Sequence, residues 1–206
     1  MSNVLMIDTI TEWVRQNVCA HIKLKQPPAD LEAANDARLD YQLVTPAAFG
    51  MYIPTSERLP PGIRVPYPAV CVRALNGEDD AVQGTGWADL QLVFCTWDTG
   101  THGEDFIMPG GDGTHHVWSG EEADAYFRRH GEGWRDAWNF ADLAIRALEN
   151  TTRIGNYPLD RATPIRYGPL TEQEAIPDYY PYWYAWVTFR VQYPLVRNIV
   201  ELQEFL

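Results

Sequence analysis

The sequence predicts an α+β fold: a mostly antiparallel sheet with an N-terminal helix and a long helix packed chiefly on one face, and with extended loop insertions. Three observations predict this fold class. Residues 178–193 alternate between two kinds of side chain with period two, and residues 69–97 resemble two strands joined by a glycine-rich turn. Residues 134–148 carry apolar side chains at helical spacing. We expect a single domain over residues 1–206, since chains of this length usually form one.

Composition and charge exclude several classes of protein. Hydrophobic residues make up 46% and charged residues 21% of the chain, the balance of a folded globular protein. The formal charge of −12 repels phosphate backbones, so we expect no specific binding of nucleic acid. Three widely spaced cysteines predict no disulfide framework and synthesis in a reducing cytoplasm. We find no signal-peptide pattern and no apolar run long enough to span a bilayer, so we expect no membrane partner.

The first predicted element is an amphipathic N-terminal helix that ends at Pro27 and Pro28. Its apolar side chains are Ile7, Ile10, Val14, Val18 and Ile22, and the side chains expected to face outward are Thr11, Glu12, Arg15 and Gln16. Residues 29–40 form a weaker alanine-rich segment, either a short helix or a loop. Residues 39–44 are compatible with an added strand.

Six prolines interrupt residues 45–68, which predicts an extended excursion without a helix or a sheet ladder. Excursions of this length are uncommon unless they are functional or disordered. The apolar side chains of this segment favour a functional role. We therefore take Met51 and Tyr52 as candidate contacts with a neighbouring subunit.

Two strands are predicted next, at residues 69–75 and 87–97. The segment between them is glycine-rich and begins with an acidic turn at residues 76–80, as an antiparallel hairpin requires. In the second strand Leu90, Leu92 and Phe94 share one face, and Asp89, Gln91 and Val93 share the other. A glycine-rich loop follows over residues 98–118.

A capping box formed by Ser119 and Glu122 predicts the start of a helix, which glycines 131 and 133 interrupt. The stronger half of this helix has a predicted buried stripe of Trp134, Trp138, Ala141, Ile145 and Leu148. After it we expect a turn at residues 155–160, a short strand at residues 165–167 and an apolar tail at residues 199–206.

The last strand, DYYPYWYAWVTFRVQY, carries many of the chain's aromatic side chains. One parity is almost purely apolar and predicts a core face, whereas the other is aromatic and polar, which suits a half-wet surface. The expected core anchors are Trp183, Val187 and Phe189, and the candidate subunit contacts are Tyr182, Tyr184 and Trp186. The alternative is that the same chain covers both faces.

The polar residues form no recognisable catalytic pattern. The possible metal ligands are His102, Glu104, Asp105, Asp112, His115, His116 and His130, but their spacing matches no HExxH pair, which favours a solvated loop. Phosphate-binding loops and GxSxG motifs are missing, and adjacent acids in a turn are usually solvated. We therefore expect no enzyme and no cofactor. The alternative is a metal-dependent enzyme that uses the histidines of residues 102–116.

Five segments carry a resemblance to a known family: the helix of residues 6–21, PAVCVRAL, DLQLVFCTW, WRDAWNFADLAIRALEN and YAWVTFRVQY. In order and character they resemble the tail-terminator (tail-completion) proteins of long-tailed bacteriophages. The resemblance covers most of the chain and includes no catalytic signature. Insertions at about 27–66 and 98–118 make this chain larger than a compact member of the family.

The resemblance implies a structural virion protein, made in the host cytoplasm and located at the head-proximal end of the tail. A homohexameric ring would cap the tail tube, contact the tail-tube protein and join it to the head–tail connector protein, while genome DNA passes through without specific binding. Six copies at −12 would carry about −72, and an acidic lumen repels DNA. We place the acidic residues Glu78, Asp79 and Asp80, or the loop of residues 98–118, at the lumen or a rim. The alternative structural role is another neck or baseplate subunit.

Overall fold

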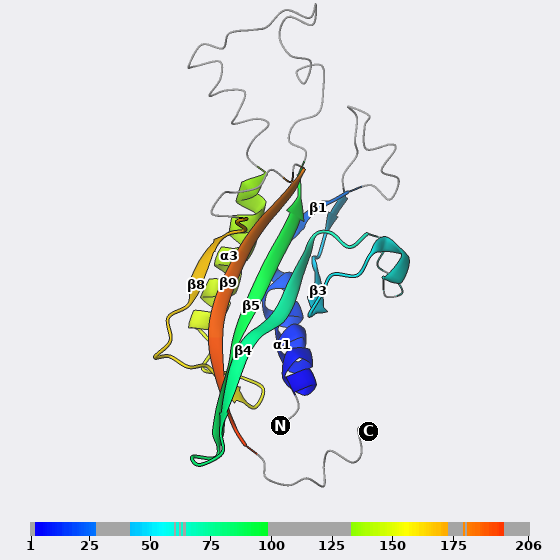
Figure 1. The fold of residues 1–206 in the computed structure, drawn as a ribbon. Helices are drawn as coiled ribbons and strands as arrows, with labels where there is room; N and C mark the ends of the chain where they lie inside the picture. Colours follow the sequence, from blue (N-terminus) through cyan, green and yellow to red (C-terminus); the bar gives the residue numbers. More distant parts are fainter. Residues whose placement is uncertain are drawn as a thin grey trace, which may run out of the picture.

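The computed structural model describes residues 3–27, 42–59, 61, 63, 65–98, 133–172, 179 and 181–195. The helices are α1 (Asn3–Asn17) and α3 (Trp134–Glu149), with short 3-10 segments η1 (Cys19–His21) and η3 (Ser56–Arg58). The strands are β1 (Leu24–Gln26), β2 (Gln42–Val44), β3 (Ala47–Gly50), β4 (Ala69–Asp80), β5 (Thr85–Trp97), β6 (Arg153–Ile154), β7 (Tyr157–Pro158), β8 (Arg166–Pro169) and β9 (Tyr182–Pro194). The predicted α+β fold class is confirmed (Figure 1).

Five strands form the main sheet in the order β3-β4-β5-β9-β8 (Figure 1). The β4–β5, β5–β9 and β9–β8 pairs are antiparallel, and β3 runs parallel to β4 at one edge. The sheet is therefore mostly antiparallel, as predicted. β5 and β9 pair along their whole lengths, so the aromatic strand lies inside the sheet rather than at its edge.

The strand β3 corrects the expectation that prolines would exclude any ladder from residues 45–68. It lies between Pro46 and Pro54, and the N–H of Ala47 donates to the carbonyl of Pro68 at 3.0 Å. An edge strand needs partners on one side only, so prolines beside it are tolerated. The strand β2 falls where the sequence is compatible with one, and its partner β1 was not predicted.

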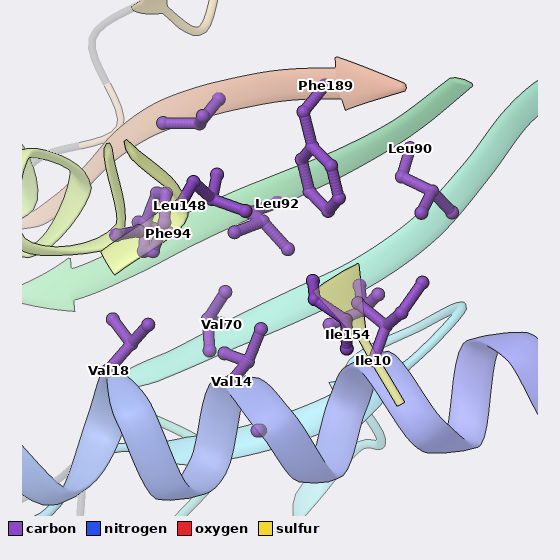
Figure 2. Packing of buried hydrophobic residues seen from close by; sticks show 14 of the residues in the cluster. Ile10, Val14, Val18, Val70, Leu90, Leu92, Phe94, Leu148, Ile154 and Phe189 are labelled. Atoms are coloured by element: carbon purple, nitrogen blue, oxygen red, sulfur yellow. The ribbon is translucent and has the colours of Figure 1, made fainter. Parts of the chain in front are cut away.

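α1 packs on the sheet through the apolar side chains that the sequence indicates. Ile10 and Val14 are buried, and in Figure 2 they point with Val18 toward the sheet residues Val70 and Leu92. The helix ends at Asn17, earlier than predicted, and the apolar stripe continues into η1.

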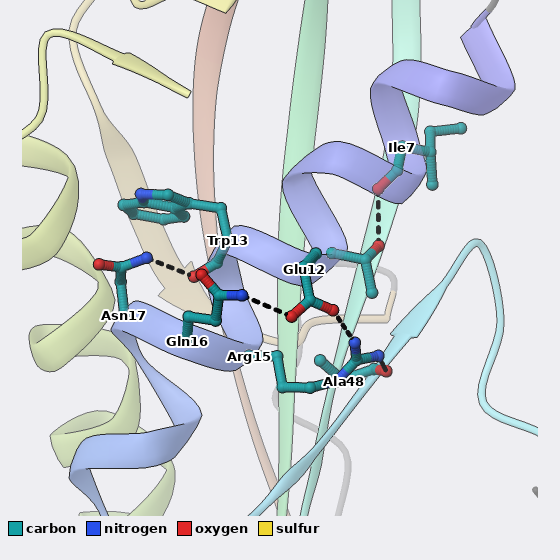
Figure 3. Close-up of polar contacts among 8 residues, drawn as sticks. Ile7, Glu12, Trp13, Arg15, Gln16, Asn17 and Ala48 are labelled. Carbon is teal, nitrogen blue, oxygen red and sulfur yellow. Dashed lines mark hydrogen bonds and ion pairs between the residues drawn. The ribbon is translucent and has the colours of Figure 1, made fainter. Parts of the chain in front are cut away.

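The polar side of α1 is shown in Figure 3. Arg15 and Gln16 both donate to the carboxylate of Glu12, so these three side chains face outward as expected. Arg15 also reaches the carbonyl of Ala48 at 3.4 Å, which ties the helix to the edge strand β3. The outward prediction for Thr11 was wrong: it is buried, and its hydroxyl donates to a carbonyl one turn earlier, which satisfies it inside the helix.

α3 packs on the same side of the sheet as α1, but with a different stripe from the one predicted (Figure 1). The buried side chains are Ala137, Phe140, Ala141, Ala144 and Leu148. Trp134 is 43% exposed, and Trp138 packs edge-on against Tyr167 with ring centroids 6.2 Å apart. Alanines let the helix approach the sheet closely, and the large indole rings therefore lie beside the contact rather than within it.

β4 and β5 form a longer hairpin than predicted. Residues 76–80, which we expected to form an acidic turn, belong to β4, and the turn is at residues 81–84. The carboxylate of Asp80 accepts the N–H groups of Val82 and Gln83, both at 2.9 Å, which fixes this turn. A β-bulge lies between Ala74 and Asn76.

The second half of the chain matches some predictions and leaves others open. The strand expected at residues 165–167 is β8, and the turn expected at residues 155–160 begins between β6 and β7, which form a small hairpin. The segment at residues 29–40, the loop at residues 99–118, the capping box of Ser119 and Glu122 and the tail at residues 199–206 lie outside the described residues.

The three cysteines provide a first test of this fold, because all are free and buried. Burial raises the pKa of the Cys19 and Cys95 thiols to about 12 and also raises that of Cys71. Since the thiolate is the reactive form, we expect the folded protein to react with thiol reagents far more slowly than the unfolded protein. The raised pKa values stabilise the fold below the ordinary thiol value of 9.0, and this contribution is lost as the pH rises toward 12.

Mass spectrometry after alkylation, with and without denaturant and across alkaline pH, measures this protection. Rapid labelling of all three thiols in the native protein at neutral pH would contradict the described core.

Candidate interaction face

The face of the main sheet opposite α1 and α3 is called the outer face below. On the helix side, alternate residues of β5 and β9 such as Leu92 and Val187 join both helices in one buried cluster. The intervening residues point to the outer face, where the register aligns them in rows across the strands. From one end, past the terminal pair of Trp97 and Tyr182, these rows are Ala47, Ala69, Cys95 and Tyr184; Phe49, Cys71, Val93, Trp186 and Gly168; Arg73, Gln91, Thr188 and Arg166; Asn76, Asp89 and Arg190; and Glu78, Trp87 and Gln192.

The first row is covered by the chain itself. The ring of Tyr67, from the proline-rich excursion, lies 4.9 Å from that of Tyr182, measured between centroids. The hydroxyl of Tyr184 interacts with Cys95 and Tyr67, and burial raises the pKa of Tyr184. Two of the candidate subunit contacts therefore already have aromatic partners within the chain.

Trp186, in the second row, packs against the edge strand β8. Its indole N–H donates to the carbonyl of Pro169 at 2.7 Å. A Cβ atom added to Gly168 would lie 2.9 Å from the indole ring, so this glycine makes room for Trp186. The indole remains half-buried and forms, with Val93, the apolar middle of the outer face.

The third row crosses four strands and is basic. Arg73 and Arg166 are exposed at its two ends, and Gln91 and Thr188 lie between them. No ion pair joins either arginine to an acid among the residues that the structure describes. We call these four residues the arginine row.

The fourth row contains an arginine that is both ion-paired and stacked on an aromatic ring. Arg190 donates to both carboxylate oxygens of Asp89, at 2.7 and 2.9 Å, and its guanidinium stacks 3.7 Å from the ring centroid of Trp87. Paired and stacked in this way, Arg190 is held in place and is already neutralised.

The three acidic residues predicted for a lumen or rim lie together at the end of the β4–β5 hairpin. Glu78 and Asp80 pair with Trp87 and Thr85 on the outer face. Asp79 points to the helix side, where its carboxylate accepts the hydroxyl of Tyr193 at 2.9 Å. We call this end the acidic hairpin, and Figure 1 shows it extending beyond the helices. An open groove of about 670 Å³ beside it is lined by acids and by Arg190, which is bound to Asp89.

The remaining candidate contacts lie apart from the others. Met51 is 49% exposed and Tyr52 is 67% exposed, just after β3. Met51 has a φ of 66°, a left-handed conformation that is uncommon for a residue with a side chain. Since β4 and β5 lie between β3 and β9, these two residues do not form one patch with Trp186.

The described part of the chain contains no candidate metal centre. There, no three His, Cys, Asp or Glu residues are grouped so that they could hold a metal ion. The histidines of residues 102–116 lie outside the described residues, so the alternative metal site is untested. None of the helices in the described ranges is both long and apolar enough to cross a membrane.

The arginine row is the feature that the sequence analysis missed. Arg73 and Arg166 are 93 positions apart and come from strands that neighbour neither each other nor, in the case of β4, the aromatic strand. The sequence indicates which face of its strand each arginine occupies, but it does not indicate the register that places both arginines in one row.

A scan against protein-family models finds no matching family, and a search of the curated proteins finds no match.

Proposed function

We propose that this chain is a structural subunit of a long-tailed phage virion, forming a ring that caps the tail tube and joins it to the head–tail connector. The observation that carries the proposal is the one-sided fold. Both described helices pack on one face of the sheet, and the outer face carries half-buried aromatic and exposed charged side chains. Such a mixed surface suits contact with another protein.

Two further observations support the proposal. The five segments that carry the resemblance form α1, β4, β5, α3 and β9, which are the three central strands of the main sheet and its two helices. The net charge of −12 would also give a ring through which DNA passes without adhering.

Electron microscopy of phage particles made without the protein tests this function. We expect filled heads separated from tails, with tails of irregular length, and recovery when the wild-type chain is supplied from a plasmid. Antibody labelling of intact particles is expected at the head-proximal end of the tail.

Normal particles in the absence of the protein would contradict a structural role. Labelling at the distal end would instead favour the alternative of a baseplate subunit.

A further inference from the structure

The arginine row carries two positive charges that no acid among the described residues pairs with. Arg73 and Arg166 are exposed and lack an acid partner among the described residues, in a chain whose net charge is −12. They lie on β4 and β8, three strand spacings apart, which places their backbones about 14 Å from each other. A partner that carries acids on a narrow, extended surface would fit between them.

The acidic hairpin carries the opposite charge, on three carboxylates. Glu78 is exposed, Asp79 accepts a hydrogen bond from Tyr193 and Asp80 accepts two from backbone N–H groups. These donors are neutral, so they orient the carboxylates without cancelling their charge. Arg190, which lines the groove beside the hairpin with Glu78 and Asp80, is bound to Asp89.

The two surfaces do not meet within one copy. Glu78 and Arg73 lie on the same strand, and their partners Trp87 and Gln91 are four residues apart on β5, which separates the two by about 14 Å along a hydrogen-bonded sheet. A rigid sheet cannot fold back on itself, so the contact requires a second molecule.

We propose that the acidic hairpin of one copy docks on the arginine row of the next copy. The inference rests on the proposed function, because it describes how neighbouring ring subunits recognise each other. In a ring each copy offers its hairpin to one neighbour and its arginine row to another, so the contact is heterologous and can repeat, whereas two copies that made both contacts with each other would close as a two-fold dimer. Apolar surface accompanies the charges on both sides: Val82 at the hairpin turn is 93% exposed, and Val93 and Trp186 are next to the arginine row.

Two full-length variants with opposite charge changes test the docking. One carries Glu78→Lys, Asp79→Asn and Asp80→Asn, in which the asparagine oxygens still accept the native hydrogen bonds. The other carries Arg73→Glu and Arg166→Glu. The helix-side pair Arg146→Glu and Arg153→Glu makes the same change in net charge as the second variant and is its matched control. Circular dichroism verifies that each variant folds.

Light scattering and analytical ultracentrifugation at low salt then measure self-association. We expect the wild type and the control to associate, each charge variant alone to associate at least about tenfold more weakly, and an equimolar mixture of the two variants to recover association. Recovery is expected because each variant then supplies the charge that the other needs. Salt of about 1 M, where the Debye length is about 3 Å, is expected to weaken the wild-type complex.

The inference is overturned by a monomeric wild type at low salt, by charge variants that associate as the wild type does, or by a mixture that does not recover. Its failure can be told apart from failure of the proposed function. If the charge variants assemble normal tails, the docking is wrong while the ring role stands. If particles form normally without the protein, the ring role is wrong whatever the self-association shows.

Discussion

Replacing Phe94 by alanine is expected to lower the free energy of unfolding by about 3–5 kcal/mol. Phe94 is fully buried on the helix side of β5, and its ring meets that of Phe140 in α3 edge-on at 4.8 Å between centroids. The truncation removes this contact and leaves a cavity at the joint between the sheet and α3. Urea unfolding followed by circular dichroism measures the loss.

Val93→Ala is the matched control, since it changes the neighbouring residue of the same strand on the outer face. Val93 is only half-buried, so we expect a loss of less than about 2 kcal/mol. Equal losses of unfolding free energy at the two positions would contradict the description in which both helices bury only one face of the sheet.

Replacing Gly168 by valine is expected to destabilise the fold by about 1–3 kcal/mol. Strand propensity alone predicts the opposite sign, because valine favours strands and glycine does not. The added Cβ would lie 2.9 Å from the indole of Trp186, which must then move and give up its hydrogen bond to Pro169. Thermal unfolding measures the change, and tryptophan fluorescence reports movement of the indole.

A double-mutant cycle with Trp186→Ala isolates this clash. Once the indole is removed, valine at position 168 meets no obstruction there, so its cost should fall or change sign. A cost that is the same in both backgrounds would mean that the glycine is needed for another reason.

The fold could be predicted from the sequence where one side of an element is uniformly apolar. β5 and β9 show this: the alternation of Leu92 with Val93 and of Val187 with Trp186 matches the two faces of the sheet. α3 shows the limit. Its contact face is built from small alanines, whereas hydrophobicity gives most weight to tryptophans, so the predicted stripe was rotated from the buried one.

The candidate surfaces were predictable residue by residue but not as surfaces. The alternation in β9 places Tyr184 and Trp186 on the outer face, as predicted. It does not reveal that Tyr67, from the proline-rich segment, contacts Tyr184. Such contacts depend on which distant segments of the chain pack together, and a single sequence does not show this.

The bulge in β4 determines the register in which the end of β4 pairs with β5. Leu75 is the extra residue, and without a bulge to absorb it Glu78 would lie opposite Gly86 on the helix side, with Asp79 turned outward. That slipped arrangement would put the longer Glu78 in place of Asp79, break the hydrogen bond between Asp79 and Tyr193, and crowd the space above Gly86 that Asp79 and Tyr193 already fill. The hydrogen bond between Asp79 and Tyr193 thus favours the observed register of β4. A chain lacking Leu75 should keep every remaining side chain of β4 on its present face.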